Sequence, residues 1–189
     1  MKLAIILTIL LILIGGCSTV QESPSGPTIK TTPTISGTQD LILNEQDLQQ
    51  LGMSDGTDCY TDEEYTNIVD SSVGQYSFCN YTILNDTEVV VELQKFANYE
   101  ALNGSYQYGS SHLYSIEGII SENDYGDQST FRVNNENDYM GNLNEPGVYY
   151  YHLWFTKYLY LIHITSKGTE EAAGDSIEKI GQQILSKFG

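Results

Sequence analysis

Basic side chains are scarce in this chain. Its 189 residues include 8 Lys and Arg against 25 Asp and Glu, so the formal net charge is −17 at pH 7, and Arg132 is the single arginine. A surface with this charge repels nucleic acid and anionic lipid headgroups. We therefore expect no nucleic-acid partner. An acidic surface attracts cations, but a solvated acidic face explains the composition without any metal site.

Sequence signatures of well-known active sites are also missing. The chain contains no GxSxG, HExxH, P-loop or GxGxxG pattern. With a single arginine, the chain is also poorly equipped to handle phosphate groups. We assign no catalytic residue and predict a non-enzymatic binding or accessory module. Its ligand would be an unidentified small molecule, glycan or protein.

Long apolar runs are confined to the N-terminus. Residues 1–17 read MKLAIILTILLILIGGC, in which Lys2 precedes twelve residues that are apolar except for Thr8. This run is too short for a membrane-spanning helix and has the layout of a secretory signal. A plain secretory peptide or a short N-terminal anchor would share this layout.

The end of this run carries a more specific pattern. Ile14-Gly15-Gly16-Cys17 resembles the lipobox of prokaryotic lipoproteins. The resemblance implies that residues 1–16 are a signal peptide and that the chain is cleaved before Cys17. It further implies a lipid on the Cys17 sulfur, which would anchor the protein in the cell membrane on its extracytoplasmic side.

Proline is almost absent beyond residue 38, because three of the four prolines lie in the segment 18–38. Fifteen of the 21 residues in that segment are Ser, Thr, Pro or Gly. Such a segment cannot bury enough apolar surface to order itself. We predict a lipid-anchored tether over residues 17–38 and a single globular domain over residues 39–189.

Three cysteines are present, at positions 17, 59 and 79. Once Cys17 is assigned to the lipid, Cys59 and Cys79 remain as an even pair. An exported chain meets an oxidising compartment, so these two residues are expected to form a disulfide. A redox-active or metal-binding thiol pair is the alternative, although the spacing is not that of a CxxC motif.

Hydrophobic periodicity predicts an α+β domain with a mostly antiparallel sheet of about six strands and helices packed on one face. Strands are expected at 75–84, 88–96, 115–123, 128–134, 148–155 and 158–165, and helices at 45–51, 99–112 and 169–188. Residues 54–66 are expected to form a loop. Gly174 and Gly181 lie on one side of the last helix and would permit close contact with the sheet. This order of elements loosely resembles the PsbP/Mog1-like sandwich, but no motif transfers a function.

The last two strands carry the strongest candidate surface. If Thr156-Lys157 is a two-residue turn, His152 lies across from Leu161 and His163 lies across from Tyr150. The two histidines are then diagonal neighbours on one face beside Trp154. Tyr150, His152, Trp154 and His163 form a possible binding surface for a sugar or a peptide. With a carboxylate from elsewhere, the histidines would also suit Zn²⁺ and a metal-dependent hydrolase; ordinary sheet packing is the alternative.

Two further kinds of site rest on local patterns. Acidic loops offer oxygen ligands for Ca²⁺, although turn chemistry explains the same residues; they contain Asp55, Asp58, Asp62, Glu63, Glu64, Asn123, Asp124, Asp127, Glu136 and Asp138. Asn-X-Ser/Thr sequons mark possible glycosylation sites in an exported chain; they begin at Asn80, Asn85 and Asn103. A purely structural or adhesive surface lipoprotein is a further interpretation of the whole chain.

Overall fold

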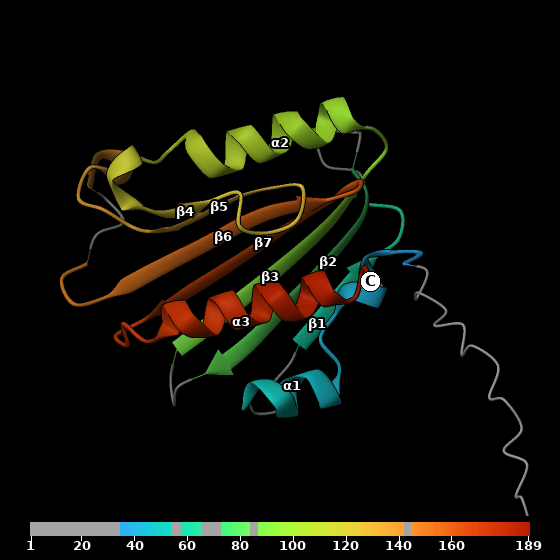
Figure 1. Cartoon of the computed structure of the whole chain (residues 1–189), viewed down its shortest axis with the longest axis horizontal. Helices are drawn as coiled ribbons and strands as arrows, with labels where there is room; N and C mark the ends of the chain where they lie inside the picture. The colour runs from blue at the N-terminus through green and yellow to red at the C-terminus, as the bar shows by residue number, and fades with distance from the viewer. Residues whose placement is uncertain (1–34, 54–57, 66–72, 84–86, 142–144) are drawn as a thin grey trace, which may run out of the picture. The chain divides into compact units, whose positions relative to one another are not determined.

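The computed structural model describes residues 35–53, 58–65, 73–83, 87–141 and 145–189. The predicted signal peptide, Cys17 and the predicted tether as far as residue 34 lie outside these ranges, as do Asp55 and Asn85. The described residues belong to one compact unit, Thr32–Gly189. This unit is built around a single sheet with helices on either side (Figure 1).

The sheet has seven strands, and every neighbouring pair is antiparallel. Their order in the sheet is β1-β2-β3-β7-β6-β5-β4. The bounds are β1 Asp58–Asp62, β2 Val73–Ile83, β3 Thr87–Phe96, β4 Ile119–Glu122, β5 Gln128–Val133, β6 Tyr149–Lys157 and β7 Tyr160–Gly168. The predicted α+β class is confirmed. The additional strand is β1, which lies in the segment expected to be a loop; it is an edge strand without apolar alternation, so periodicity does not reveal it.

The described residues form three α-helices, α1 Glu45–Leu51, α2 Tyr99–Ser111 and α3 Ala173–Ser186. They also form short 3-10 turns at Thr38–Leu41, Ile116–Gly118 and Asp138–Gly141. Side-chain caps begin α1 and α2, because Asn44 Oδ1 accepts from the backbone N–H of Asp47 and Asn98 Oδ1 accepts from that of Ala101. Helix α3 begins four residues later than the expected Thr169, after Ala172, which makes no side-chain cap.

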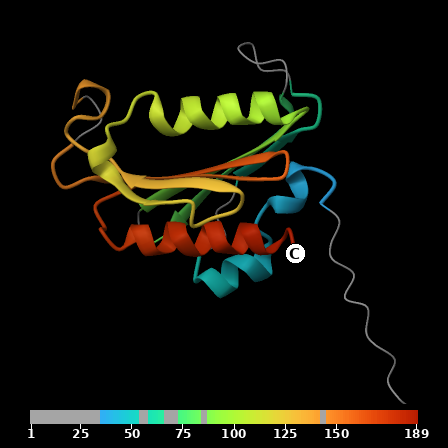
Figure 2. The same cartoon turned by 45° about the horizontal axis from the view of Figure 1, so that its top comes forward.

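The helices pack on both faces of the sheet, and not on one face as the sequence predicted (Figure 2). Successive residues of β7 point to opposite faces. Ile162 and Ile164 join the core beneath α3, whereas Leu161 packs with Leu102 and Tyr106 of α2. The expectation failed because the apolar stripe of α2 is short and gives no indication of which face it covers.

Helix α3 approaches the sheet closely through two glycines, as the sequence predicted. A Cβ atom at Gly181 would lie 2.5 Å from Leu153 Cδ2, and one at Gly174 would lie 3.1 Å from the Tyr151 ring. Between them, Ile177 and Ile180 are fully buried. Any larger residue at position 181 would therefore push the helix away from β6.

Contacts near the two ends of the domain join α1 to α3. Lys187 Nζ lies 2.8 Å from Asp47 Oδ2 and donates to the backbone carbonyl of Ile42. Asp47 also accepts a hydrogen bond from Gln183. Two residues assigned to the tether also belong to this domain, since Ile35 packs against the core and Thr38 is buried with its Oγ1 accepting from Ser77.

The predicted disulfide joins the two strands at one edge of the sheet. Cys59 of β1 lies directly opposite Cys79 of β2, and the two residues are bonded. The bond closes a loop with a sequence separation of 20. By the chain-entropy estimate, such a loop stabilises the fold by about 3 kcal/mol. It holds a short, largely exposed strand against the rest of the sheet.

The single arginine forms a buried ion pair. Arg132 Nη2 lies 2.7 Å from both carboxylate oxygens of Asp138, and both side chains are almost fully buried. Asp138 also accepts from the backbone N–H groups of Ser115 and Asn135, and Arg132 donates to the Ser115 carbonyl. Asp138 therefore fastens the loop after β5 to the sheet, where the sequence had suggested a calcium ligand.

Removing one partner of this pair is expected to destabilise the domain strongly. Arg132→Met or Asp138→Leu alone leaves a buried charge without a partner and should lower the free energy of unfolding by about 3–5 kcal/mol, whereas the double variant should recover part of the loss. Urea unfolding of residues 32–189 at pH 7 measures the effect. Lys157→Met is the matched control, because Lys157 and Asp127 form a partly exposed pair that contributes under about 1 kcal/mol. If Arg132→Met lowered the free energy of unfolding by no more than Lys157→Met does, the buried ion pair would not have the importance assigned to it.

Candidate functional site

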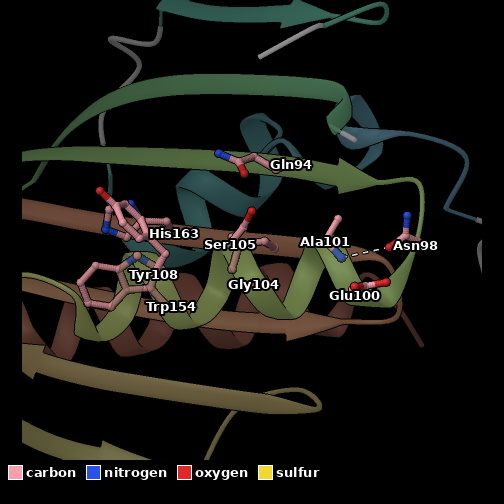
Figure 3. A pocket seen from close by; sticks show the side chains of 11 residues that line it. Gln94, Asn98, Glu100, Ala101, Gly104, Ser105, Tyr108, Trp154 and His163 are labelled. Carbon is pink, nitrogen blue, oxygen red and sulfur yellow. Dashed lines mark hydrogen bonds between the residues drawn. The ribbon is translucent and has the colours of Figure 1, made fainter. Parts of the chain in front are cut away.

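An open groove lies between α2 and the face of the sheet that carries Trp154. Its volume is about 760 Å³, which falls within the range of small-molecule sites. The lining comes from β3, α2, β6 and β7 and comprises Gln94, Asn98, Glu100, Ala101, Gly104, Ser105, Tyr108, Gly109, Trp154, Leu161 and His163. Figure 3 shows Tyr108, Trp154 and His163 gathered at one end of the groove, with Asn98 and Glu100 at the other.

Helix α2 forms one wall of the groove, and the absence of a side chain at Gly104 keeps this wall open. A Cβ atom at Gly104 would meet no atom within 4 Å. Glycine inside a helix costs about 1 kcal/mol relative to alanine. The glycine therefore leaves space in the groove, and no steric conflict explains its presence.

The floor of the groove is a group of stacked rings. Trp154 is 3% exposed, and its ring lies parallel to the rings of His163 and His152, with centroid separations of 4.5 and 5.0 Å. Tyr114 packs against both Trp154 and His152 at 5.3 Å. Because these rings support one another on several sides, the floor is fixed in position.

A chain of hydrogen bonds runs from the floor across four strands, β2, β3, β7 and β6. His163 Nδ1 lies 2.8 Å from Glu92 Oε2 on β3. His163 Nε2 lies 3.2 Å from His152 Nδ1 and 2.9 Å from Thr165 Oγ1. The Tyr76 hydroxyl donates to the second carboxylate oxygen of Glu92. The network orients the His163 ring on both of its nitrogens.

The surroundings shift the pKa values of this network. Burial, followed by the charges of His163 and Arg132, holds the pKa of His152 well below its usual 6.5. Burial raises the pKa of Glu92, but hydrogen bonds and charge from His163 and the Tyr76 hydrogen bond outweigh it and leave that pKa lowered. Burial and the nearby Glu92 raise the pKa of the Tyr76 hydroxyl. At neutral pH the network therefore holds an ionised Glu92 and an uncharged His152.

The hydrogen bonds of the network determine which ring nitrogens of the histidines face the groove. Both ring nitrogens of His163 are hydrogen-bonded within the protein, so neither is presented to a molecule in the groove. Within the described ranges, no three His, Cys, Asp or Glu side chains converge on a point that would hold a metal ion.

The structure brings together three of the four residues predicted to form a surface. His152, Trp154 and His163 are neighbours on one face, as expected. The predicted register is wrong, because the turn falls at Tyr158-Leu159 instead of Thr156-Lys157, and His152 therefore pairs with Thr165 instead of Leu161. Asp127 fixes this turn by accepting from the Tyr158 backbone N–H and pairing with Lys157. A shift of the turn by two residues leaves every side chain on the same face of the sheet. His152, Trp154 and His163 therefore share one face in spite of the wrong register.

Tyr150 does not reach the groove. It lies further along β6, opposite Lys167, and its hydroxyl donates to Glu145. His152 lies beside Trp154, two residues before it on β6, and does not line the groove. The lining residues contributed by α2 and β3 were missed, because sequence periodicity does not reveal which helix covers which strands. Gly104 and Gly109, two glycines within a predicted helix, are the feature of the sequence that could have indicated the groove.

The remaining candidates are spread over the surface of the domain. Asp62 accepts from the backbone N–H of Glu64, and Asp127 is engaged at the β6–β7 turn. The sequon residues Asn80 and Asn103 are exposed, on β2 and α2, and Asn103 Oδ1 accepts from Gln128. Across the described residues, no helix has the length and apolar character needed to span a membrane.

The low pKa of His152 makes the stability of the domain depend on pH. As the pH falls below about 6.5, histidine takes up a proton in the unfolded chain but not in the folded one, so the free energy of unfolding decreases. The free energy of unfolding should therefore be lower at pH 5.5 than at pH 7.5. Chemical denaturation across this range should show a clearly flatter dependence in His152→Phe, which keeps a flat ring beside Trp154. His112→Gln, at an exposed residue, is the control. If the pH dependence of the free energy of unfolding were unchanged in His152→Phe, His152 would not be its source.

Comparisons with known proteins find only distant similarities. No family model matches the chain, and no curated protein matches its sequence. Among solved structures, it is similar to the extracellular domain of PknH from Mycobacterium tuberculosis, with a TM-score of 0.47 and 8% identity over 78% of this chain and 94% of that chain. It is also similar to a GTP binding regulator from Thermotoga maritima, with a TM-score of 0.36 and 10% identity over 70% and 76% of the two chains. Both similarities are weak and concern only the course of the backbone.

Proposed function

We propose that this protein is a lipid-anchored, extracytoplasmic binding module that holds a small ligand in the groove beneath α2. The single observation that carries the proposal is the open groove of about 760 Å³ over a fixed aromatic floor. Pockets of this size, with a mainly apolar floor and a few polar groups at their rim, are the usual form of ligand sites. The bound ligand would contact Tyr108 and the edge of Trp154.

The absence of catalysis in this proposal follows from how the polar groups are used. The histidines nearest the groove are hydrogen-bonded to Glu92, to Thr165 and to each other. A general base must reach the proton that it removes. His163 has no nitrogen left for this role, so the network serves to position the floor.

Placement outside the cytoplasm is supported by the disulfide and by the N-terminal pattern. The Cys59–Cys79 bond is of a kind that persists in oxidising compartments. Residues 1–17 have the layout of an export signal ending at a lipid-accepting cysteine. Stable anchoring requires two acyl chains, since one chain holds a protein only weakly.

Lipidation is tested by labelling. In a prokaryotic host, the full chain should incorporate an alkyne analogue of palmitate and partition into the detergent phase, because the lipid would be attached to Cys17. Cys17→Ser should lose both properties, whereas Cys59→Ser should keep them. Labelling that persists in Cys17→Ser would contradict the proposed anchor.

Ligand binding in the groove is tested by filling it. Gly104→Leu adds a side chain where a Cβ atom meets no neighbour, and leucine is a better helix former than glycine. The variant should therefore fold at least as well as the unmodified protein. The probes are neutral disaccharides, short peptides and aromatic fragments such as indole.

We expect at least one class of probe to raise the melting midpoint and to change the fluorescence of Trp154, the single tryptophan. The response should disappear in Gly104→Leu and persist in Gln107→Leu, an exposed position on the same helix that does not line the groove. No response to any probe, or a response that survives in Gly104→Leu, would refute the proposed function.

A further inference from the structure

The polar rim of the groove indicates what kind of molecule it accepts. Two amide side chains, Gln94 and Asn98, and the Glu100 carboxylate line the groove; in Figure 3, Asn98 and Glu100 lie at the N-terminal end of α2 and Gln94 lies between the two ends of the groove. Amides both donate and accept hydrogen bonds, and a carboxylate accepts them. Because Asn98 Oδ1 caps the helix, its amide nitrogen is the group available to a ligand. A purely apolar ligand would remove these groups from water without replacing their hydrogen bonds, which is unfavourable.

The charge of the residues that line the groove further restricts the class of ligand. Among the described residues that line the groove, none is Lys or Arg, and Glu100 is the one carboxylate. The whole chain carries a formal net charge of −17. Phosphorylated and carboxylated ligands would be repelled by this field and would find no cationic partner. The ligand is therefore uncharged or positively charged.

The aromatic groups favour an uncharged ligand over a cation. A cation-binding site presents the faces of aromatic rings to the charge, but Trp154 is almost fully buried by its neighbours. Tyr108 offers the one largely exposed ring of the lining, at 65% exposure. One face of this ring stacks on His112, with centroids 4.4 Å apart, which leaves the other face open. A single open aromatic face beside amide groups suits a sugar ring, which presents a face of C–H groups to the aromatic ring and hydroxyl groups to the amides.

The length of the groove fits more than one sugar ring. Asn98 and Tyr108 are ten residues apart on α2, which corresponds to about 15 Å along the helix axis. The absence of a side chain at Gly104 opens the space between them. A ligand that stacks on Tyr108 and hydrogen-bonds to Asn98 must extend across this distance.

We propose that the groove binds a short, uncharged oligosaccharide, which stacks one ring on Tyr108 and hydrogen-bonds through its hydroxyls to Gln94, Asn98 and Glu100. This inference rests on the proposed function, because it names the ligand class of the same groove. Tyr108 and the rim residues determine specificity, while Trp154 and His163 support the floor.

Calorimetric titration tests the proposal with the full chain in a non-glycosidic detergent. The neutral probes are cellobiose, maltose and N,N′-diacetylchitobiose, and the contrasting probes are glucose 6-phosphate, indole and lysine methyl ester. At least one neutral disaccharide should bind, and glucose 6-phosphate should bind at least tenfold more weakly. Tyr108→Ala should weaken binding of the disaccharide at least tenfold, Tyr108→Phe should preserve it, and Gln94→Leu should weaken it. Tyr108 is exposed, so its variants leave the core untouched.

The outcomes separate this inference from the proposed function. If indole or the amine binds in a Gly104-dependent manner and no disaccharide does, the groove is a ligand site but the saccharide assignment is wrong. If a disaccharide binds equally well to Tyr108→Ala, the stacking role is wrong and the proposal falls. If no probe binds, both the assignment and the proposed function fail.

Discussion

The alternation of side chains along β7 is the constraint on which the rest of the structure depends. β7 lies at the centre of the sheet, and its even-numbered residues Ile162 and Ile164 fill the core beneath α3, where two glycines let the helix approach closely. Its odd-numbered residues Leu161 and His163 face α2. That face is only partly filled, because α2 carries a glycine at position 104 where a side chain would occupy the space. One strand thus gives the domain a closed side and a side with a groove.

Polar groups on the open side are arranged to hold its floor in place. The His163 ring is bonded at both nitrogens, and His152, behind it, stays uncharged because burial opposes its protonation. On the far side of His152, the buried pair of Arg132 and Asp138 joins the sheet to the loop after β5. Hydrogen bonds between buried side chains restrict the motion of the groups that they join. A rigid floor suits recognition, because little conformational freedom is lost when a ligand binds.

Local signals in the sequence predicted much of this fold. The predicted bounds of α1 and α2 agree with the structure to within one residue, because Asn44, Asn98 and Gly52 fix these helix ends through interactions within a few residues. The register of the last hairpin was wrong because Asp127, distant in sequence, determines where the chain turns. Strand β1 was missed because its exposed edge carries no apolar pattern. The groove escaped prediction because it forms where α2 crosses β3, β6 and β7, and no local rule encodes that crossing.

The central claim is that the face beneath α2 is a ligand site while the face beneath α3 is purely structural. Amide chemical-shift mapping of ¹⁵N-labelled residues 32–189, titrated with cellobiose, tests this claim most directly. The account predicts that the largest shifts fall on residues 94–109 and 161–163, including Gln94, Gly104 and His163, while Ile177 and Ile180 of α3 stay unchanged. Shifts concentrated on α3, or distributed evenly over the surface, would contradict it.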